Sequence, residues 1–427
     1  MATKYIIRIA ALAATLLSAA ACIYPFEVEL GHNGEWPLVI EGDILIGDIS
    51  TVSLSHVRPF NADPNDFQSF TATGYIEGED GTRITGESLY DKIGNDMVTS
   101  PSLASSSRIL SSSSWSPSFT SEAALTFDTT PIQGNQRYRL HLTTLDLNGK
   151  ELNTYESDWL EPCPAPTIDG LTYSNHPEYK ELWIGLSMHC NGSHYFRWTF
   201  DEDWEYHSDV YTNLEYKVKE KKVDYYDVGT YNLYYCWKSA KSSQIDIFST
   251  ANQTEDRFEE LAFHRIPLGD KRLQVLYRIQ VHLDAISEKA YDYWNNIKQG
   301  SEGQGSIFSP TPSQMASNVH CISDADVQVV GYLNLSTRAS ATMYYDNGLN
   351  HFYIPGNLAE RDDQKVSNSQ KDSLAYWYAH GYLPFDLIYD APAPEPSHTM
   401  WTPKYCIDCR LQGGTKTRPK DWPNGDH

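Results

Sequence analysis

Hydrophobic and polar residues alternate along much of this chain, in short runs separated by turns rich in Gly, Asp and Asn. In RYRLHLTTL, residues 137–145, the alternation places Tyr138, Leu140 and Leu142 on one side and polar residues on the other. A period of two is typical of an antiparallel strand with one buried face. Similar runs occur at residues 37–44, 51–57, 71–78 and 151–159. The pattern therefore predicts a mainly β protein.

These runs lie close together in residues 37–160, which predicts an immunoglobulin- or fibronectin-like β-sandwich. The serine-rich residues 100–118 are expected to form a surface loop within it. Residues 161–166, with the sequence EPCPAP, contain three prolines and predict a stiff linker. Strand-like runs continue after it, so residues 167–427 are expected to form a larger β-rich domain.

One segment of the second domain has helical periodicity instead. Its apolar residues recur at steps of four, four and three: Ile286, Ala290, Trp294 and Ile297. This spacing places them on one face of a helix near residues 286–299. Asp284 or Ser287 is suited to cap its beginning and Gly300 to close its end. The apolar face is expected to pack in the core.

The sequence of residues 1–21 predicts a signal peptide. Lys4 and Arg8 precede an apolar run that is shorter than the roughly 20 residues of a transmembrane helix. The run ends in three alanines before Cys22, which resembles a bacterial lipoprotein signal, whose cysteine is lipidated and becomes the new N-terminus. Residues 22–36 would then form a tether. The alternative is an ordinary secretory signal with a cysteine nearby.

Net charge limits the partners of the protein. The 427 residues carry a formal charge of −23. Phosphate backbones and anionic lipid surfaces are bound by basic proteins. We therefore expect no nucleic-acid partner, and membrane contact only through the lipid on Cys22.

The remaining cysteines are expected to be structural. An exported protein lies in an oxidising compartment, where an even number of cysteines favours disulfides. If Cys22 carries lipid, six others remain: Cys163, Cys190, Cys236, Cys321, Cys406 and Cys409. Sequence alone does not choose among their pairings.

The pair Cys406 and Cys409 raises the question of a metal or redox site. A structural zinc site needs four ligands, and the chain has only one Cys-x-x-Cys pair. The glycines and prolines that follow disfavour the helix of a thiol redox motif. We therefore expect these two cysteines to form disulfides, with each other or with cysteines elsewhere, and to hold the tail in place.

Aromatic residues make up 13% of the chain and concentrate in two tyrosine-rich stretches, residues 225–237 and 375–389. A strand sends alternate side chains to opposite faces, so such runs cannot bury every ring on one side. Some rings are therefore expected to line a ligand or partner surface: Tyr231, Tyr235, Trp237, Trp377 and Tyr378. The chain has no zinc-protease, nucleophile-elbow or phosphate-loop motif, so no catalytic residue, metal or cofactor is predicted.

Residues 273–336 combine a strand, a helix rich in Tyr and Trp, a Gly-Ser-Ile-Phe-Ser-Pro-x-Pro segment, an Asn-Val turn and a Val-x-Val-Val-Gly-Tyr strand. With CIDCRLQGGTKTRPKDW at residues 406–422 and the lipoprotein-like signal, this order resembles the lipoprotein family called domain of unknown function 4249. The resemblance implies an outer-membrane lipoprotein of Bacteroidetes-type bacteria, whose gene often neighbours that of a TonB-dependent receptor. It implies no catalytic residues.

These features together favour an accessory lipoprotein that is anchored in the outer membrane by lipid and exposed at the cell surface. It would bind a ligand or partner on a rigid β scaffold and work with a TonB-dependent transporter in nutrient uptake. Two alternatives remain open. One is a surface hydrolase acting on glycan or peptide, whose carboxylates cannot be recognised by spacing. The other is a structural or adhesive surface protein.

Overall fold

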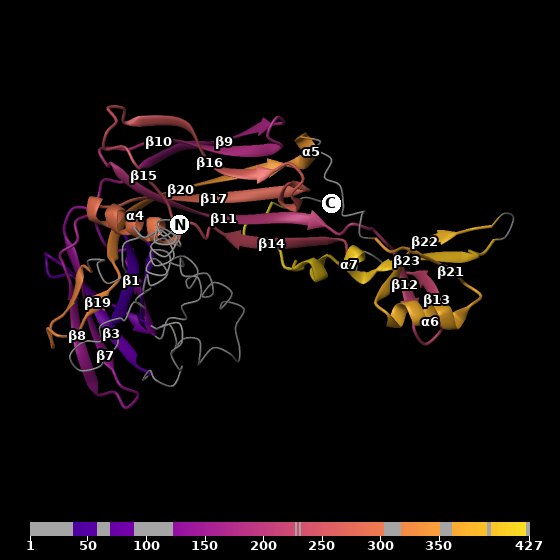
Figure 1. Cartoon of the computed structure of the whole chain (residues 1–427), viewed down its shortest axis with the longest axis horizontal. Helices are drawn as coiled ribbons and strands as arrows, with labels where there is room; N and C mark the ends of the chain where they lie inside the picture. Colours follow the sequence, from indigo (N-terminus) through magenta and orange to yellow (C-terminus); the bar gives the residue numbers. More distant parts are fainter. Residues whose placement is uncertain are drawn as a thin grey trace, which may run out of the picture.

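The computed structural model describes residues 37–57, 69–88, 123–226, 229, 232–302, 317–350, 361–390 and 394–423. It is mainly β, with 52% of residues in strands and 11% in helices. Figure 1 shows an N-terminal sandwich at one end, a central sandwich, and a smaller lobe projecting from the other end. The predicted signal peptide, Cys22, the tether and the serine-rich stretch lie outside the described residues.

The largest sheet has ten strands and runs through both sandwiches in the order β14-β11-β17-β20-β1-β2-β6-β5, with β15 paired to β11 and β19 to β1. Its strands are β1 (Leu38–Leu45), β2 (Ile49–His56), β5 (Glu87–Ser88), β6 (Ala123–Asp128), β11 (Tyr195–His207), β14 (Tyr235–Lys241), β15 (Asp246–Ser249), β17 (Leu276–Ala285), β19 (Val329–Val330) and β20 (Leu333–Asp346).

Two smaller sheets complete the sandwiches, in the orders β18-β8-β7-β3-β4 and β16-β10-β9. Their strands are β3 (Thr71–Gly78), β4 (Arg83–Thr85), β7 (Tyr138–Leu145), β8 (Glu151–Ser157), β9 (Thr167–His176), β10 (Glu181–His189), β16 (Arg257–Pro267) and β18 (Val319–Cys321). The predicted strand at residues 71–78 is confirmed residue for residue by β3. In β7, Tyr138, Leu140 and Leu142 are buried, as the alternation predicted.

The remaining strands lie in the lobe, and short helices connect the parts. The lobe strands are β12 (Leu214–Lys217), β13 (Lys222–Tyr225), β21 (Gln364–Ser367), β22 (Tyr382–Ile388) and β23 (His398–Pro403). The helices are α4 (Glu288–Glu302), α5 (Asn347–Asn350), α6 (Lys371–Ala379) and α7 (Lys404–Ile407), with 3-10 turns at Lys271–Leu273 and Cys409–Gln412.

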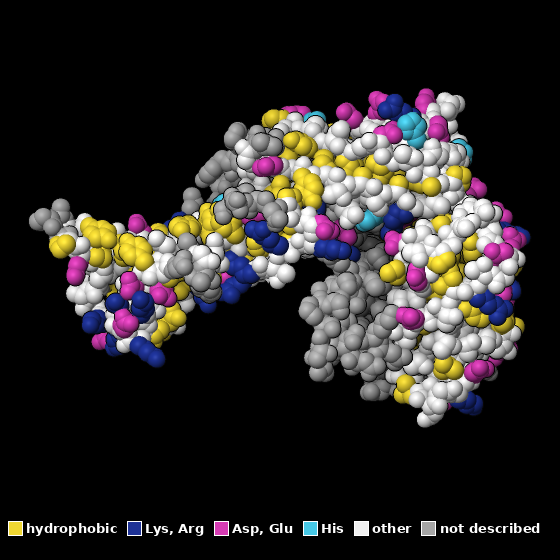
Figure 2. Space-filling model, turned by 180° about the vertical axis from the view of Figure 1, so that it is seen from behind, with side chains coloured by type: hydrophobic (Ala, Val, Ile, Leu, Met, Phe, Trp, Pro, Cys, Tyr) yellow, Lys and Arg dark blue, Asp and Glu magenta, His cyan; other side chains and the backbone are white. Residues whose placement is uncertain are grey.

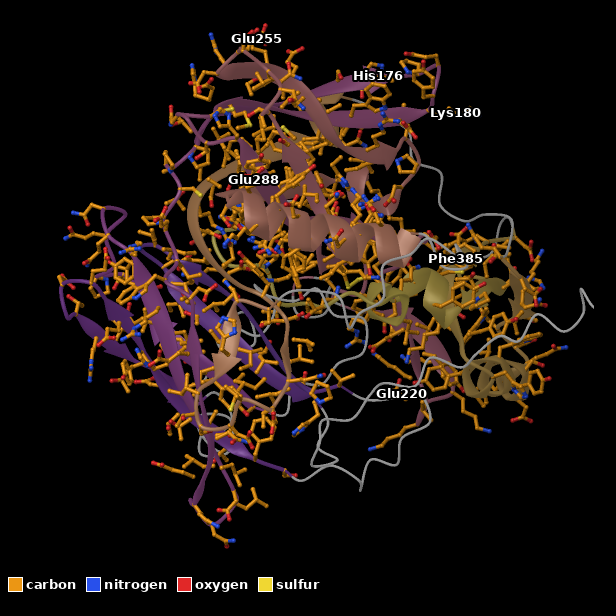
Figure 3. All side chains as sticks on the ribbon, turned by 60° about the vertical axis from the view of Figure 1, so that its left-hand side comes forward. His176, Lys180, Glu220, Glu255, Glu288 and Phe385 are labelled. Atoms are coloured by element: carbon orange, nitrogen blue, oxygen red, sulfur yellow. A yellow bond between two sulfur atoms is a disulfide. The ribbon has the colours of Figure 1, made fainter. Side chains whose placement is uncertain are left out.

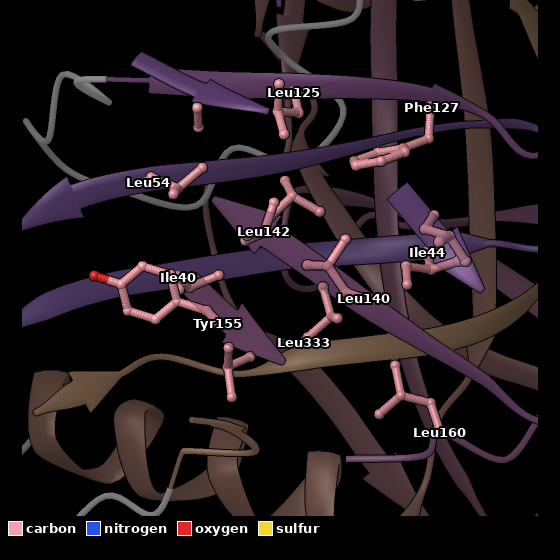
Figure 4. Packing of buried hydrophobic residues seen from close by; sticks show 14 of the residues in the cluster. Ile40, Ile44, Leu54, Leu125, Phe127, Leu140, Leu142, Tyr155, Leu160 and Leu333 are labelled. Carbon is pink, nitrogen blue, oxygen red and sulfur yellow. The ribbon is translucent and has the colours of Figure 1, made fainter. Parts of the chain in front are cut away.

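The N-terminal sandwich takes strands from both halves of the chain. β1 pairs with β2 on one side and, in parallel, with β20 on the other, where Gly42 lies opposite Leu333. Its core, shown in Figure 4, includes Leu333 and also buries Val319 and Leu335. The predicted division into a sandwich at 37–160 and a separate domain at 167–427 therefore does not follow the strand pairing. β1 needs a neighbour on its second edge, and the later segment provides it.

Residues 161–166 contain no helix or strand, as expected for a linker, but they are bonded to the body. The Cys163 carbonyl accepts a hydrogen bond from Thr337 Oγ1 at 3.0 Å. The Pro164 carbonyl accepts one from Ser193 Oγ at 2.7 Å. The segment is thus fixed on the surface of the sheet and does not separate two independent units.

Helix α4 is confirmed, with its apolar residues against the sheet. Ala290 is fully buried, and Trp294 and Ile297 pack against the same cluster. Of the two candidate caps, Ser287 fills the role: its Oγ accepts the Ala290 N–H at 3.2 Å. Gly300 lies inside the last turn, since the helix continues to Glu302.

The tail after the lobe is fastened to β14 by a disulfide between Cys236 and Cys409, 173 residues apart. Thr415 then exchanges two backbone hydrogen bonds with Trp237, at 2.8 and 2.9 Å. The turn between them requires glycine, because a Cβ on Gly414 would lie 2.4 Å from the Tyr206 hydroxyl. The predicted staple is therefore present, although Cys406 takes no part in it.

Candidate functional site

The lobe is built from two segments that lie far apart in the sequence. The β12–β13 hairpin is inserted between two strands of the central sheet, and residues 361–407 supply β21, β22, β23 and α6. Figure 3 shows Glu220 of the hairpin and Phe385 of the second segment in the same projecting unit. The segments share one small core of buried residues: Tyr216, Val366, Leu374 and Trp401. The lobe is thus a packed unit that extends from the body.

Exposed tyrosines concentrate on this lobe and at its junction with the body. Each is between 40% and 57% exposed: Tyr211, Tyr225, Tyr376, Tyr378, Tyr389 and Tyr405. Figure 2 shows hydrophobic side chains in a row along one edge of the lobe. Tyrosine gives a large contact area at low cost in side-chain entropy, and it is enriched in binding surfaces. A cluster of exposed rings on a projecting unit is therefore the candidate interaction surface.

Several of these rings are held in place by neighbours. Tyr378 packs on Tyr216 of the lobe core with ring centroids 5.0 Å apart. Tyr376 lies 3.9 Å from the ring of His380. The hydroxyl of Tyr389 is hydrogen-bonded to Tyr225, which raises the pKa of Tyr389. Rings that are fixed before binding lose little entropy when a partner covers them.

The structure separates the five aromatic residues predicted to contact a ligand. Trp377 and Tyr378 lie on α6 of the lobe, with Trp377 half-buried against Tyr382 at 4.9 Å. Tyr235 and Trp237 lie on β14 in the body. Tyr231 is outside the described residues.

Trp237 is part of the tail anchor. It is 8% exposed, and the Arg418 guanidinium lies 5.2 Å from its ring centroid. Its ring is therefore covered and does not contribute to an open surface. Two further tyrosines of the lobe, Tyr225 and Tyr389, lie at the ends of the two tyrosine-rich stretches, so their exposure could have been expected from the sequence. Tyr211 lies outside both tyrosine-rich stretches, so the sequence did not indicate its exposure.

The other cysteines make no disulfide in the described part of the chain: Cys163, Cys190, Cys321 and Cys406 are free. Burial raises the pKa of the Cys163 and Cys190 thiols, and likewise that of Cys406. A raised pKa keeps the thiol protonated and unreactive. These residues act as small apolar side chains in the described structure.

One line of side chains has the residue types of a serine hydrolase. Ser340 Oγ lies 2.8 Å from His282 Nδ1, and Asp201 Oδ2 lies 3.9 Å from His282 Nε2. The second distance exceeds a hydrogen bond, and Asp201 is shared with Lys241 at 3.5 Å. The line is thus a set of cross-strand polar contacts and not an assembled catalytic relay.

Among the described residues, no group of three or more His, Cys, Asp or Glu side chains is placed to hold a metal ion. The helices in that part of the chain are all too short or too polar to cross a bilayer.

Comparison with protein-family models places most of the chain in one family. The family model described as "Domain of unknown function (DUF4249)" matches residues 23–342. This range includes most of both sandwiches and the β12–β13 hairpin, and it ends within β20, before the second segment of the lobe. No curated protein matches the chain.

Proposed function

Since the chain belongs to the DUF4249 family, we propose that it is an accessory lipoprotein of the outer membrane that binds a partner through its projecting lobe. The partner is a TonB-dependent transporter, and the shared task is nutrient uptake. The lipoprotein-like sequence before Cys22 supports the anchor. The observation that carries the binding role is the cluster of exposed tyrosines on the lobe.

A lipid anchor and a projecting lobe suit this role together. An acyl chain on Cys22 confines the protein to the membrane plane, which raises its effective concentration near a membrane partner. The lobe then extends away from the sandwiches and presents tyrosines that face solvent in the free protein. Covering them on binding would remove apolar area from water and stabilise the complex.

A surface hydrolase is supported less well. It would rest on Ser340, His282 and Asp201, whose geometry is that of surface contacts between neighbouring strands. A structural or adhesive role has no residue-level observation in its favour.

The test is co-purification from the native host. The protein is tagged, the outer membrane is solubilised in mild detergent, and the proteins that bind are identified by mass spectrometry. We expect a stoichiometric TonB-dependent receptor with the unmodified chain. A Tyr376→Ser/Tyr389→Ser variant should lose most of it, because these two lobe rings are 53% and 51% exposed.

Tyr179→Ser is the matched control, since Tyr179 is 62% exposed but lies on the β9–β10 turn of the body. This variant should retain the receptor. Recovery of the folded, membrane-bound protein without any receptor would overturn the proposal. If the lobe variant and the control lose the receptor equally, the lobe tyrosines are not the surface that binds it.

A further inference from the structure

The central sheet has one apolar and one polar face. On the apolar face, β17 buries Tyr277, Ile279, Val281 and Leu283 against the β16-β10-β9 sheet. The alternate residues of β17 are Arg278, Gln280, His282 and Asp284. Residues opposite each other in an antiparallel pair share a face. The partners of β17 on β11 and β20 therefore extend this second face.

The strand pairing arranges the polar face in rows across three strands. Thr199, His282 and Ser340 form one row. The next row is Asp201, Gln280 and Thr342, and Lys241 of β14 lies beside Asp201. The row after that is Asp203, Arg278 and Tyr344. Each of these described positions carries a hydrogen-bonding side chain, and none is aliphatic. We name this surface the polar face.

Charges on the polar face are paired with their neighbours. Arg278 contacts Asp203 at 2.5 Å, and Lys241 contacts Asp201 at 3.5 Å. Burial raises the pKa of Asp201, but the nearby His282 and Lys241 outweigh burial and lower that pKa. The carboxylate therefore stays ionised and balances the lysine. Such a surface attracts neither phosphate nor a metal ion strongly, since each needs an excess of one charge.

The middle of the polar face has unused hydrogen-bonding capacity. The side chains of Thr199, Gln280 and Thr342 make no hydrogen bond within the described part of the chain, and Thr342 is exposed. A hydroxyl both donates and accepts, and an amide has two donors and an acceptor. Side chains on adjacent strands are about 4.8 Å apart and those along one strand about 7 Å apart. This spacing suits a ligand with a hydroxyl on nearly every carbon.

An aromatic edge borders the same face. Tyr344 is 38% exposed, and its ring lies 6.4 Å from that of Trp422. Trp422 comes from the disulfide-anchored tail and donates its indole N–H to Glu205 at 3.2 Å. The Arg278 guanidinium lies 5.6 Å from the Trp422 ring and holds it in position. Exposed aromatic rings offer an apolar surface to the C–H face of a sugar.

We propose that the polar face binds a neutral saccharide. Gln280, Thr342 and Thr199 would hydrogen-bond its hydroxyls, and Tyr344 would stack on one of its rings. Paired charges, open hydroxyl and amide groups, and an aromatic edge together match a neutral polyol better than an anion or a peptide. The site is separate from the lobe, and this inference does not depend on a transporter partner.

The experiment uses the full chain, purified in detergent without other proteins. Binding is measured by calorimetry after screening an array of neutral oligosaccharides built from glucose, mannose, galactose or xylose, with heparin and a mixed peptide library for comparison. We expect at least one neutral saccharide to bind. Gln280→Ala and Thr342→Ala should each weaken that binding about tenfold, as expected for one lost hydrogen bond.

Gln253→Ala is the matched control, because Gln253 is exposed in the loop after β15 and lies outside the polar face. Its affinity should equal that of the unmodified chain, and circular dichroism checks that each variant is folded. The proposal is overturned if no neutral saccharide binds, if only heparin or peptides bind, or if the two polar-face variants bind as tightly as the control. None of these outcomes depends on whether the lobe recruits a transporter.

Discussion

The side chain of Asp284 lies fully buried between the guanidinium groups of two arginines. Arg338 Nε contacts it at 2.6 Å, and Arg197 Nη2 contacts it at 3.2 Å while also reaching Asp43 at 2.6 Å. Asp43 belongs to β1, Arg197 to β11, Asp284 to β17 and Arg338 to β20. The cluster therefore joins the two sandwiches by charge as well as by strand pairing. Removing one member would leave buried charge without a partner.

The pKa of Asp284 leads to a prediction about acid stability. Burial raises this pKa, but Arg338 and Arg197 outweigh burial and lower it from 3.8 to about 2. A lowered folded-state pKa contributes stability above 3.8 that is lost as the pH falls through about 2. We expect the free energy of unfolding, measured in urea, to fall across this window. Asp284→Asn should be less stable by about 3–5 kcal/mol at neutral pH and show a smaller decline.

Asp372→Asn serves as the comparison, since the Asp372 side chain is 96% exposed and, among the described residues, its one ion pair is a surface pair with Lys221. Its effect should stay within about 0.5 kcal/mol. If Asp284→Asn unfolds at the same urea concentration as this control at every pH, the buried cluster does not stabilise the fold.

At the scale of elements, the C-terminal tail shows how a segment without long helices or strands is held. Tyr206 donates to the Cys409 carbonyl at 2.7 Å, and the disulfide at Cys409 closes a loop that contains β15 to β23. Beyond it, Trp422 is 7% exposed on the polar face. The disulfide thus limits how far the tail can move from β14, and it keeps Trp422 beside Tyr344, the aromatic residue of the proposed saccharide site.

Breaking the disulfide is therefore expected to loosen the tail first. Cys409→Ser should reduce the free energy of unfolding by about 2–4 kcal/mol, as for bridges that close long loops. The readout is the melting temperature with and without reductant, together with limited proteolysis after Lys416 or Lys420. Reductant should lower the melting temperature of the unmodified chain and leave that of Cys409→Ser unchanged.

Cys321→Ser provides the control, because Cys321 is free and only partly buried. It should respond to reductant as the unmodified chain does. A Cys409→Ser protein that melts with the unmodified chain and resists proteolysis equally would show that the tail is held by its other contacts alone.

At the scale of the whole molecule, the two sandwiches share a sheet and the N-terminal core takes residues from both. Val319, Leu333 and Leu335 are at most 3% exposed within that core. β18 also extends the second sheet by pairing with β8. A fragment ending at residue 160 would lose these side chains and leave one edge of β1 unpaired.

The isolated fragment 37–160 is therefore expected not to fold. Its amide NMR spectrum should show the narrow dispersion of an unfolded chain, and its melting curve should lack a cooperative transition. Joining residues 317–336 to it through a Gly/Ser linker should restore dispersion, because the missing strand and core residues return. A well-dispersed spectrum from 37–160 alone would contradict this account of the fold.

The strands, the helix and the burial within them could be read from the sequence, because each depends on local periodicity. β3, the buried side of β7 and the apolar stripe of α4 were predicted for this reason. Exposed tyrosines at the lobe were anticipated only in part. Trp377 and Tyr378 lie there, whereas Trp237 is covered by a tail residue 181 positions later in the chain (418 minus 237).

The sequence by itself determined many of the strands, helix α4, the family and the chemistry available at each position, but it did not indicate helix α6 (Lys371–Ala379). Only the tertiary structure decided which segments meet. The pairing of β1 with β20, the choice of Cys236 as the partner of Cys409, and the rows of the polar face all join residues far apart in the chain. Alternation specifies which way a side chain points on its own strand, but not which strand lies beside it. That choice depends on the combined burial of all the strands.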